Sequence, residues 1–209
     1  MNAHDPAARS QPLHVLIVAL ASIYATEFAL LVLDTLVSAT IASPSSIPTP
    51  LVAIRLLYYA LMPIGGVVFL FVVHRVGTTA EAAGLPLRSS PRSMVWNYFH
   101  PIYAVLAPAG DLIDVDRFAG GDDVDYDAPS PNQWLIRTWW TVRLCSALVV
   151  LGLDLVDDAS TSRTLTLAFV VGFHVTHLLS IAMFVRLDRR LRGVERSESA
   201  WPMTPAQNP

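Results

Sequence analysis

The sequence predicts an all-α membrane protein, in which four transmembrane helices form a bundle and a short interfacial or re-entrant helix lies between spans two and three. Two observations support this prediction. Hydrophobic residues make up 53% of the 209 residues and charged residues only 15%, whereas an average soluble domain carries roughly 25% charged residues. The chain also contains four stretches of the roughly 20 mostly apolar residues that a membrane helix needs.

The four apolar stretches define the expected spans, at about residues 13–41, 51–74, 137–156 and 164–187. The first stretch is long enough to cross the membrane with a tilt. Its small residues Val37-Ser38-Ala39 resemble a signal-peptide cleavage site. Because the stretch is longer than a signal core and contains Glu27 and Asp34, we favour a retained span.

The distribution of arginine predicts the orientation. All 14 basic residues are arginine, and they concentrate in the loop 75–136 and in the tail 188–209. Membrane proteins keep such residues on the cytoplasmic side. We therefore expect a cytoplasmic N-terminal segment 1–12, a membrane domain 13–187 with a cytoplasmic middle loop, and a cytoplasmic, mostly disordered tail 188–209.

The middle loop contains an unusual segment at residues 91–108. It is rich in aromatic residues, which suit the membrane–water boundary, and Pro101 and Pro108 interrupt it. It is too short to span, so we expect an interfacial or shallow re-entrant helix. A cytoplasmic loop packed on the bundle is the alternative.

Several short motifs lie between the second span and the start of the third. They are an arginine-rich loop with Ser-Pro, an aromatic-Pro segment, a second proline and a Trp-Trp pair that opens the third span, here Arg88, Ser90-Pro91, Phe99, Pro101, Pro108 and Trp139-Trp140. In these motifs the sequence resembles a family of bacterial membrane proteins catalogued as domain of unknown function 4328. The resemblance covers roughly residues 15 to 190. It implies a membrane architecture, here in the bacterial cytoplasmic membrane, and no particular activity.

Ionisable residues at membrane depth are costly unless they find partners inside the bundle. A helical rise of about 1.5 Å per residue sorts them into two layers. The central layer contains Glu27, His174 and His177, with Arg143 just below it. The outer layer contains Asp34, Arg55 and Asp154, which lie roughly 10 Å further out.

These depths predict specific contacts. We expect Arg55 to meet Asp34 or Asp154, and Glu27 to meet Arg143 or a histidine of the fourth span. The outer layer suits an ion pair that sets helix register, or the mouth of a solute path. The central layer suits either a satisfied polar cluster or a proton relay. Glu27, His174 and His177 are also weak candidates for metal ligands.

The acidic residues after Pro108 form a second candidate feature. The run from Asp122 to Asp127 resembles half of a calcium loop, but it lacks the glycine and the final glutamate of that motif. We expect a solvated acidic loop, with a weak calcium site or a docking surface for a basic partner as alternatives. No recognised catalytic motif is present. The single cysteine, Cys145, is expected to be buried and inert.

These observations favour a non-enzymatic scaffold, accessory subunit or sensor in the membrane. The alternatives are a small oligomeric transporter or channel that uses the central layer, and a lipid-active enzyme that uses His100 with Asp111 or Asp114. The expected partners are the lipid bilayer, and other membrane proteins or further copies of the chain, without nucleic acid. We expect no cofactor, and a divalent cation is the one alternative.

Overall fold

The computed structural model describes residues 6–40, 49–100, 103–119, 129–153 and 158–200. These residues form helices and no strand: α1 (Pro6–Thr40), α2 (Thr49–Ala82), α3 (Pro91–Trp96), α4 (Tyr103–Phe118), α5 (Gln133–Leu153) and α6 (Ala159–Ala200). Helices α1, α2, α5 and α6 each contain an apolar stretch long enough to cross a membrane: Leu13–Ser38, Thr49–Ala82, Gln133–Gly152 and Ser160–Val194. The predicted fold class, an all-α membrane protein with four spans, is confirmed.

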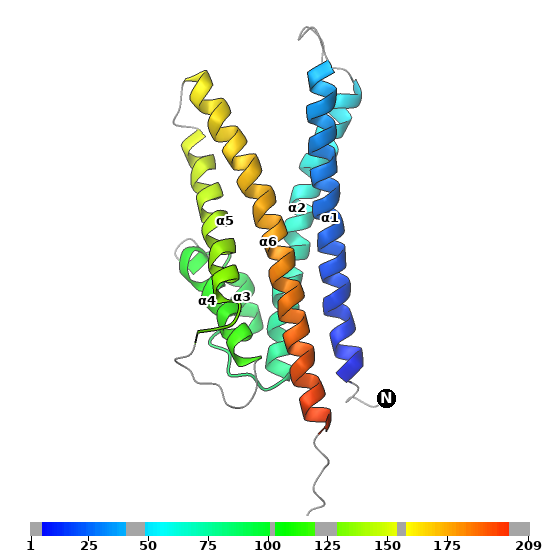
Figure 1. The fold of residues 1–209 in the computed structure, drawn as a ribbon, viewed down its shortest axis with the longest axis vertical. Helices are drawn as coiled ribbons and strands as arrows, with labels where there is room; N and C mark the ends of the chain where they lie inside the picture. The colour runs from blue at the N-terminus through cyan, green and yellow to red at the C-terminus, as the bar shows by residue number, and fades with distance from the viewer. Residues whose placement is uncertain (1–5, 41–48, 101–102, 120–128, 154–157, 201–209) are drawn as a thin grey trace, which may run out of the picture.

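The four long helices form two pairs, α1 with α2 and α5 with α6 (Figure 1). We call the half of the bundle where α1 begins and α6 ends the lower half, as it is drawn in Figure 1, and the other half the upper half. The two pairs are close together in the lower half and diverge in the upper half. The short helices α3 and α4 lie in the lower half, against α2 and α5.

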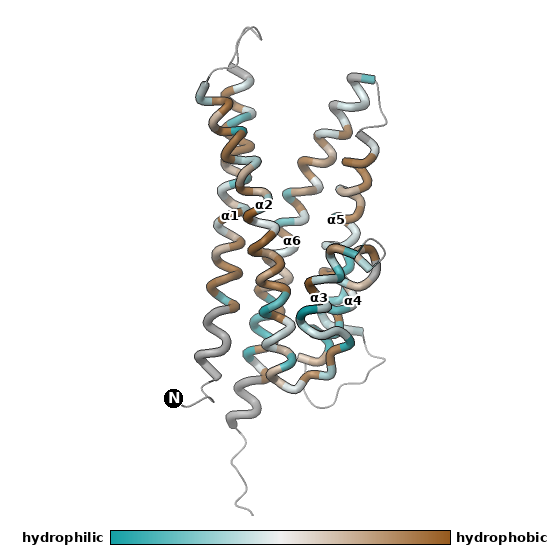
Figure 2. Tube along the Cα trace, turned by 180° about the vertical axis from the view of Figure 1, so that it is seen from behind, coloured by the Kyte–Doolittle hydropathy of each residue, from teal (hydrophilic) through white to brown (hydrophobic). Residues whose placement is uncertain are grey.

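Hydropathy differs between the two halves. Figure 2 shows hydrophobic residues along much of the four long helices, and hydrophilic residues gathered around α3 and the lower end of α2. This distribution suits a membrane-embedded bundle with a more polar lower end. Polar groups and short helices are accordingly concentrated in the lower half.

Helix α2 continues beyond the predicted end of the second span at residue 74, as far as Ala82. The chain leaves the helix at Gly84, whose φ of 68° is in the left-handed region. Two capping bonds accompany this turn: the amide of Leu85 donates to the Ala80 carbonyl at 3.1 Å, and that of Gly84 donates to the Glu81 carbonyl at 3.0 Å. This pattern is a Schellman motif. The glycine, and not the loss of hydrophobicity, therefore ends α2.

Helix α6 also exceeds its predicted span, because it runs from Ala159 to Ala200. Its start is capped by Asp158, whose carboxylate accepts a hydrogen bond from the Thr161 amide at 2.8 Å. Hydrogen bonds from Ser160 and Thr161 lower the pKa of Asp158 to about 2. The expected disordered tail is wrong for residues 188–200, which continue the helix and pack through Leu191. At the other end of the chain, residues 6–12 belong to α1.

The middle segment forms two helices and not the single short helix that we predicted. Ser90 caps α3 by accepting a hydrogen bond from the Ser93 amide at 3.2 Å, and Pro91 occupies the first helical turn. Pro108, expected to break the segment, lies inside α4. Leu112 and Val115 of α4 are completely buried. Both helices therefore pack on the bundle, and the position of residues 91–108 at the membrane boundary stays a prediction.

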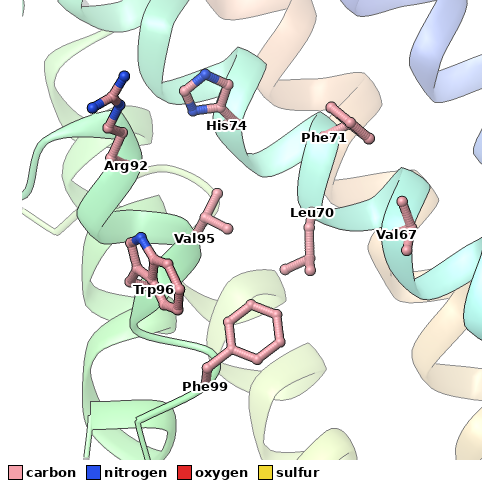
Figure 3. A pocket seen from close by; sticks show the side chains of 8 residues that line it. All are labelled: Val67, Leu70, Phe71, His74, Arg92, Val95, Trp96 and Phe99. Atoms are coloured by element: carbon pink, nitrogen blue, oxygen red, sulfur yellow. The ribbon is translucent and has the colours of Figure 1, made fainter.

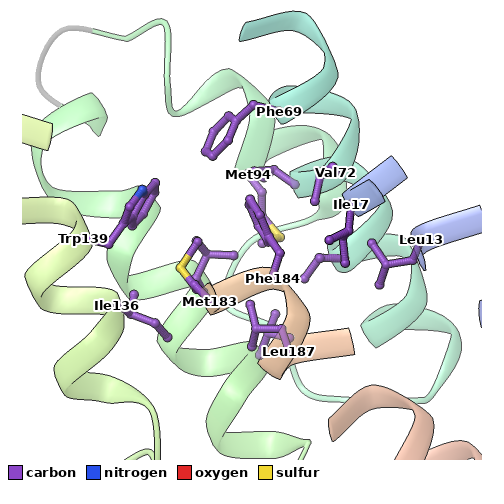
Figure 4. Close-up of a cluster of buried hydrophobic side chains, with 14 of the residues drawn as sticks. Leu13, Ile17, Phe69, Val72, Met94, Ile136, Trp139, Met183, Phe184 and Leu187 are labelled. Atoms are coloured by element: carbon purple, nitrogen blue, oxygen red, sulfur yellow. The ribbon is translucent and has the colours of Figure 1, made fainter. Parts of the chain in front are cut away.

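The main hydrophobic core lies in the lower half, where α3 and α4 complete the packing of the four long helices. Figure 4 shows its members converging from α1, α2, α3, α5 and α6. Its largest members include Phe69, Met94, Trp139 and Phe184. The Trp139 indole N–H donates to Ser180 Oγ at 2.7 Å, so the buried ring has no unpaired polar group. Adjacent Trp140 donates to the Val105 carbonyl at 2.8 Å and so attaches α5 to α4.

Helices α2 and α3 touch at a glycine. A Cβ atom added at Gly77 would lie 2.8 Å from Met94 Sδ and 3.1 Å from Pro91 Cα. The Pro91 backbone cannot move away without displacing the start of α3. Gly77 is therefore required for close contact between the two helices, as small residues commonly are in membrane bundles.

We expect the Gly77→Ala substitution to lower the free energy of unfolding by about 1–3 kcal/mol, because the added methyl group overpacks the α2–α3 contact. Gly66→Ala is the matched control in the same helix, since nothing lies within 4 Å of a Cβ atom at Gly66. The control should be neutral or stabilising by up to about 1 kcal/mol. Unfolding of both variants in detergent micelles measures the difference. Equal effects of the two substitutions would contradict the assigned contact.

Candidate functional site

A buried carboxylate lies where α1 meets α6. The side chain of Glu27 is completely buried, and its Oε2 atom is 3.5 Å from Nδ1 of His177. The imidazole of His177 stacks on the Tyr24 ring with 3.6 Å between ring centroids. Phe173 covers another side of this imidazole, at 4.1 Å. The predicted contact between Glu27 and a histidine of the fourth span is therefore present.

Helix α2 closes the other side of this pair. A Cβ atom at Gly65 would lie 3.1 Å from Glu27 Oε1 and 3.3 Å from the Tyr24 ring. The absence of a side chain at Gly65 thus allows the α2 backbone to approach the carboxylate. Neither oxygen of Glu27 accepts a hydrogen bond within the part of the chain that the structure describes. Among the described residues, the ion pair of this carboxylate is with His177.

The other two members of the predicted central layer form no ion pair with Glu27 among the described side chains. Nδ1 of His174 is hydrogen-bonded to the Val170 carbonyl of its own helix at 2.9 Å, and its ring contacts Phe28. Arg143 lies over the Phe69 ring, with 5.3 Å between its Cζ atom and the ring centroid, and near Tyr98 at 6.0 Å. Cation–π contacts of this kind stabilise a cation without a carboxylate. No ion pair connects Arg143 with Glu27 among the described side chains.

The three weak metal-ligand candidates from the sequence do not come together in this structure. Within the described residues, no group of three histidine, cysteine or acidic side chains has a geometry that could hold a metal ion. Glu27 and His177 are close together, but the ring centroids of His174 and His177 are 5.9 Å apart and His174 is bonded to its own backbone. Glu27, His174 and His177 therefore do not converge as ligands.

The outer layer contains one ion pair between α1 and α2. Nε of Arg55 donates to Asp34 Oδ1 at 2.8 Å, and Nη2 of Arg55 donates to Ser38 Oγ at 3.4 Å. The predicted contact between Arg55 and Asp34 is present. Asp154, the third member of this layer, lies outside the described residues. The pair connects the upper ends of α1 and α2 and thereby sets their register.

A polar site in the lower half was not predicted. Asp116 is completely buried and accepts hydrogen bonds from the Ser130 hydroxyl, from the Asn132 amide at 2.9 Å and from Asn132 Nδ2 at 2.7 Å. Arg190 of α6 adds an ion pair at 3.2 Å. The sequence interpretation treated Asp116 as part of a solvated acidic loop, which is wrong. Its partners come from segments far apart in the sequence, so local spacing carried no signal.

The acids nearer to Pro108 are also paired internally. Asp111 accepts a hydrogen bond from Asn97 Nδ2 at 2.9 Å, and Asp114 pairs with Arg88 at 3.4 Å. Burial raises the pKa of the Asp114 carboxyl above its ordinary value, whereas Arg88 and Arg117 oppose that shift. These contacts connect α4 to α3 and to the segment before it. The acidic run from Asp122 to Asp127 lies outside the described residues.

The catalytic arrangement suggested from the sequence is not assembled. His100 is exposed and packs on Tyr103, with 4.7 Å between ring centroids. Asp111 and Asp114, its expected acid–base partners, are engaged by Asn97 and Arg88. Cys145 is exposed on α5, and not buried as its apolar surroundings suggested.

The motif residues lie mainly in the helix contacts of the lower half. Arg88 pairs with Asp114, Pro91 packs at Gly77, and Trp139 and Trp140 hold the lower end of α5. Phe99 is exposed and lies beside α2, Pro108 is buried within α4, and Pro101 lies outside the described residues. Most of these residues thus have a structural role.

An apolar groove opens above the buried pair, where α1 and α6 diverge. Its volume is about 760 Å³. We call it the α1–α6 groove, and its lining residues are Phe28, Leu31, Val32, Thr35 and Leu36 of α1 and Ser162, Thr166, Leu167, Val170, Val171, His174, Val175 and Leu178 of α6. Most of the large apolar members of this lining are more than 40% exposed. The structure therefore presents two unpartnered apolar faces to the groove.

These features define a four-span α-helical membrane protein with one buried Glu–His contact and an open apolar groove. Residues 34–196 match the family described as domain of unknown function (DUF4328), and the chain belongs to this family. The resemblance identified from the motifs is confirmed. No curated protein and no solved structure shows significant similarity to the chain.

We expect His177→Ala to lower the free energy of unfolding by about 3 kcal/mol, because it leaves the buried Glu27 carboxylate without its polar neighbour. Adding Glu27→Gln to this variant should restore part of the loss, since a neutral amide is less costly to bury. Unfolding midpoints of the single and double variants in micelles measure this coupling. His174→Ala is the control and should show no coupling with Glu27→Gln. Additive effects at Glu27 and His177 would contradict the pairing.

Proposed function

We propose that the protein is a non-enzymatic accessory subunit or scaffold of the bacterial cytoplasmic membrane, and that its α1–α6 groove holds a transmembrane helix of a partner protein. The observation that supports this proposal is the pair of exposed apolar faces on α1 and α6. A single apolar helix lying in the groove would cover both faces. The groove has neither a metal-ligand set nor a nucleophile beside a base among its lining residues.

The dimensions of the groove suit a helix. Its lining on α6 runs from Ser162 to Leu178, which is roughly 24 Å of helix. The hydrocarbon core of a bilayer is about 30 Å thick, so the groove follows most of one span. On α1 the lining residues recur at three- and four-residue intervals, from Phe28 to Leu36. Each wall is thus a continuous helical stripe of the kind into which another helix packs.

The threonine hydroxyls of the lining do not compete with an apolar partner. The hydroxyl of Thr35 donates to the Leu31 carbonyl, and that of Thr166 donates to the Ser162 carbonyl, both at 2.8 Å. His174, at the lower end of the groove, uses Nδ1 for the Val170 carbonyl. Because both threonine hydroxyls are satisfied by their own helices, the groove favours an occupant whose surface is mainly apolar. The exception is Nε2 of His174, which has no hydrogen-bond partner among the described residues.

The charge distribution supports the orientation within this proposal. Arg186, Arg189, Arg190 and Arg192 are all on the lower part of α6, and Arg88 and Arg92 are in the lower half near α3. Under the positive-inside rule, the lower half, with the start of α1 and the end of α6, would lie on the cytoplasmic side. The α1–α6 groove consequently faces the outer half of the membrane.

Site-directed photo-crosslinking tests the occupant of the groove. A photoreactive amino acid at Val171, which is 54% exposed and lines the groove, should form an adduct of one defined mass with a second membrane protein in the native cell. The crosslinked peptide, identified by mass spectrometry, should belong to an apolar span of that partner. The same label at Leu148 of α5, which is 66% exposed outside the groove, should not form this adduct.

Three outcomes of this experiment would contradict the proposal. Adducts with lipid alone would mean that acyl chains fill the groove. Adducts with a second copy of this chain would make the groove a homo-oligomer interface. The same partner at Val171 and at Leu148 would indicate nonspecific proximity. The Val171→Trp variant gives a further check, because it should fill the groove and reduce recovery of the partner, whereas Leu148→Trp should not.

A transporter or channel is a second candidate, and the buried Glu27 is the observation that favours it. Ionisable residues that face a bundle interior commonly belong to ion or proton pathways. His177 lies 3.5 Å from the carboxylate, so a proton could pass between the two side chains after a small movement. Such a pathway would have to open, since Glu27 is completely buried in this structure.

Flux through reconstituted vesicles tests this second candidate. Wild-type protein should then dissipate a pH gradient across the vesicle membrane, and Glu27→Gln should abolish most of that flux, because an amide cannot carry the proton. Asp34→Asn is the control, since it removes a membrane carboxylate that pairs with Arg55 and lies away from His177. No flux from the wild-type protein, or equal flux from all three proteins, would contradict a role as a transporter or channel.

A further inference from the structure

A second groove lies in the lower half, between α2 and α3. Its volume is about 510 Å³, within the roughly 300–1,000 Å³ usual for ligand sites. We call it the α2–α3 groove, and it is lined by Val67, Leu70, Phe71, His74, Arg92, Val95, Trp96 and Phe99 (Figure 3). It is on a different face from the α1–α6 groove and shares no lining residue with it.

Polarity changes along the α2–α3 groove. Figure 3 shows Arg92 and His74 at the same end of the groove, and apolar side chains along the rest of both walls. On α2 the lining runs from His74 back to Val67, which is roughly 10 Å toward the middle of the bundle. On the other wall it runs from Arg92 to Phe99. A cationic end toward the helix termini and an apolar end toward mid-membrane match the headgroup and acyl chain of a lipid.

The cationic end is available to a ligand. Within the described part of the chain, the side chains of Arg92 and His74 take part in no ion pair or side-chain hydrogen bond, whereas neighbouring Arg88 pairs with Asp114. No acidic residue lines the groove. A guanidinium group binds phosphate oxygens through two parallel hydrogen bonds, and a histidine beside it supplies a further donor. This end is therefore complementary to a phosphate group.

The apolar end suits an acyl chain at the membrane boundary. Trp96 is 70% exposed and Phe99 62% exposed, although both are large aromatic residues. Their rings contact each other with 5.8 Å between centroids and form one wall opposite Leu70. Tryptophan is enriched at headgroup level, where its ring packs on acyl chains close to polar groups.

We propose that the α2–α3 groove binds one anionic phospholipid, whose phosphate contacts Arg92 and His74. An acyl chain lies along the apolar walls and covers Trp96 and Phe99. A basic pocket between membrane helices on the side rich in arginine is the usual form of such a lipid site. The site is independent of the partner helix proposed for the α1–α6 groove.

Quenching of Trp96 fluorescence by brominated lipids tests this site. The full-length protein is reconstituted in phosphatidylcholine vesicles that contain either brominated phosphatidylglycerol or brominated phosphatidylcholine as the minor lipid. The Trp96→Phe variant gives the signal of the other tryptophans, which is subtracted. We expect Trp96 to be quenched preferentially by the anionic lipid, and Arg92→Gln to reduce that preference about five-fold.

The control variant is Arg189→Gln, which removes an exposed arginine of α6 in the same lower half. It should retain the preference for phosphatidylglycerol, and Arg92→Lys should retain part of it because the charge remains. Equal losses in Arg92→Gln and Arg189→Gln would mean general attraction to an anionic surface and would overturn the site. Absence of any preference in the wild-type protein would overturn it as well. Abolition of the preference by added inorganic phosphate would identify free phosphate as the ligand.

Discussion

The contact between Glu27 and His177 marks the point at which α1 and α6 separate. Below it the two helices stay together as far as His14, whose Nδ1 atom is 3.9 Å from the Asp188 carboxylate. Above it they diverge and form the α1–α6 groove. A carboxylate buried at this depth is tolerated only with a polar neighbour. Stacking on the Tyr24 ring holds that neighbour in position, and the bare backbone at Gly65 leaves room for the carboxylate.

The lower half is stabilised in a different way from the upper half. Apolar burial alone discriminates poorly between helix arrangements in a lipid solvent, because lipid tails are as apolar as leucine. Specific contacts therefore define the arrangement: Trp139 with Ser180, Trp140 with the Val105 carbonyl, and Asp116 with Asn132 and Arg190. The upper half has the Arg55–Asp34 pair but little contact between the two helix pairs. This difference explains why α1 and α6 retain exposed apolar faces that a partner helix could cover.

The sequence predicted those contacts of the site that follow from helix geometry alone. Spacing and depth along the long helices predicted that Arg55 meets Asp34 or Asp154 and that Glu27 meets Arg143 or a histidine of the fourth span. The contacts of Arg55 with Asp34 and of Glu27 with His177 are present. The same argument grouped His174 and Arg143 with that layer. Depth does not determine the direction of a side chain, and His174 is bonded to its own backbone while Arg143 lies over Phe69 and Tyr98. Asp116 was missed because its partners, Asn132 and Arg190, are distant in sequence.

Composition and hydrophobic length sufficed for the membrane class and the four spans, because both depend on properties of single helices in a lipid solvent. The family was identified from short motifs. The ends of α2 and α6 could be assigned only from the structure, because capping at Gly84 and packing at Leu191 place both ends beyond the apolar runs. Only the structure shows that α3 and α4 pack on the bundle and that the two grooves are present. Grooves arise from the relative positions of helices, and these positions depend on long-range contacts such as Gly77 with Pro91 that no local pattern encodes.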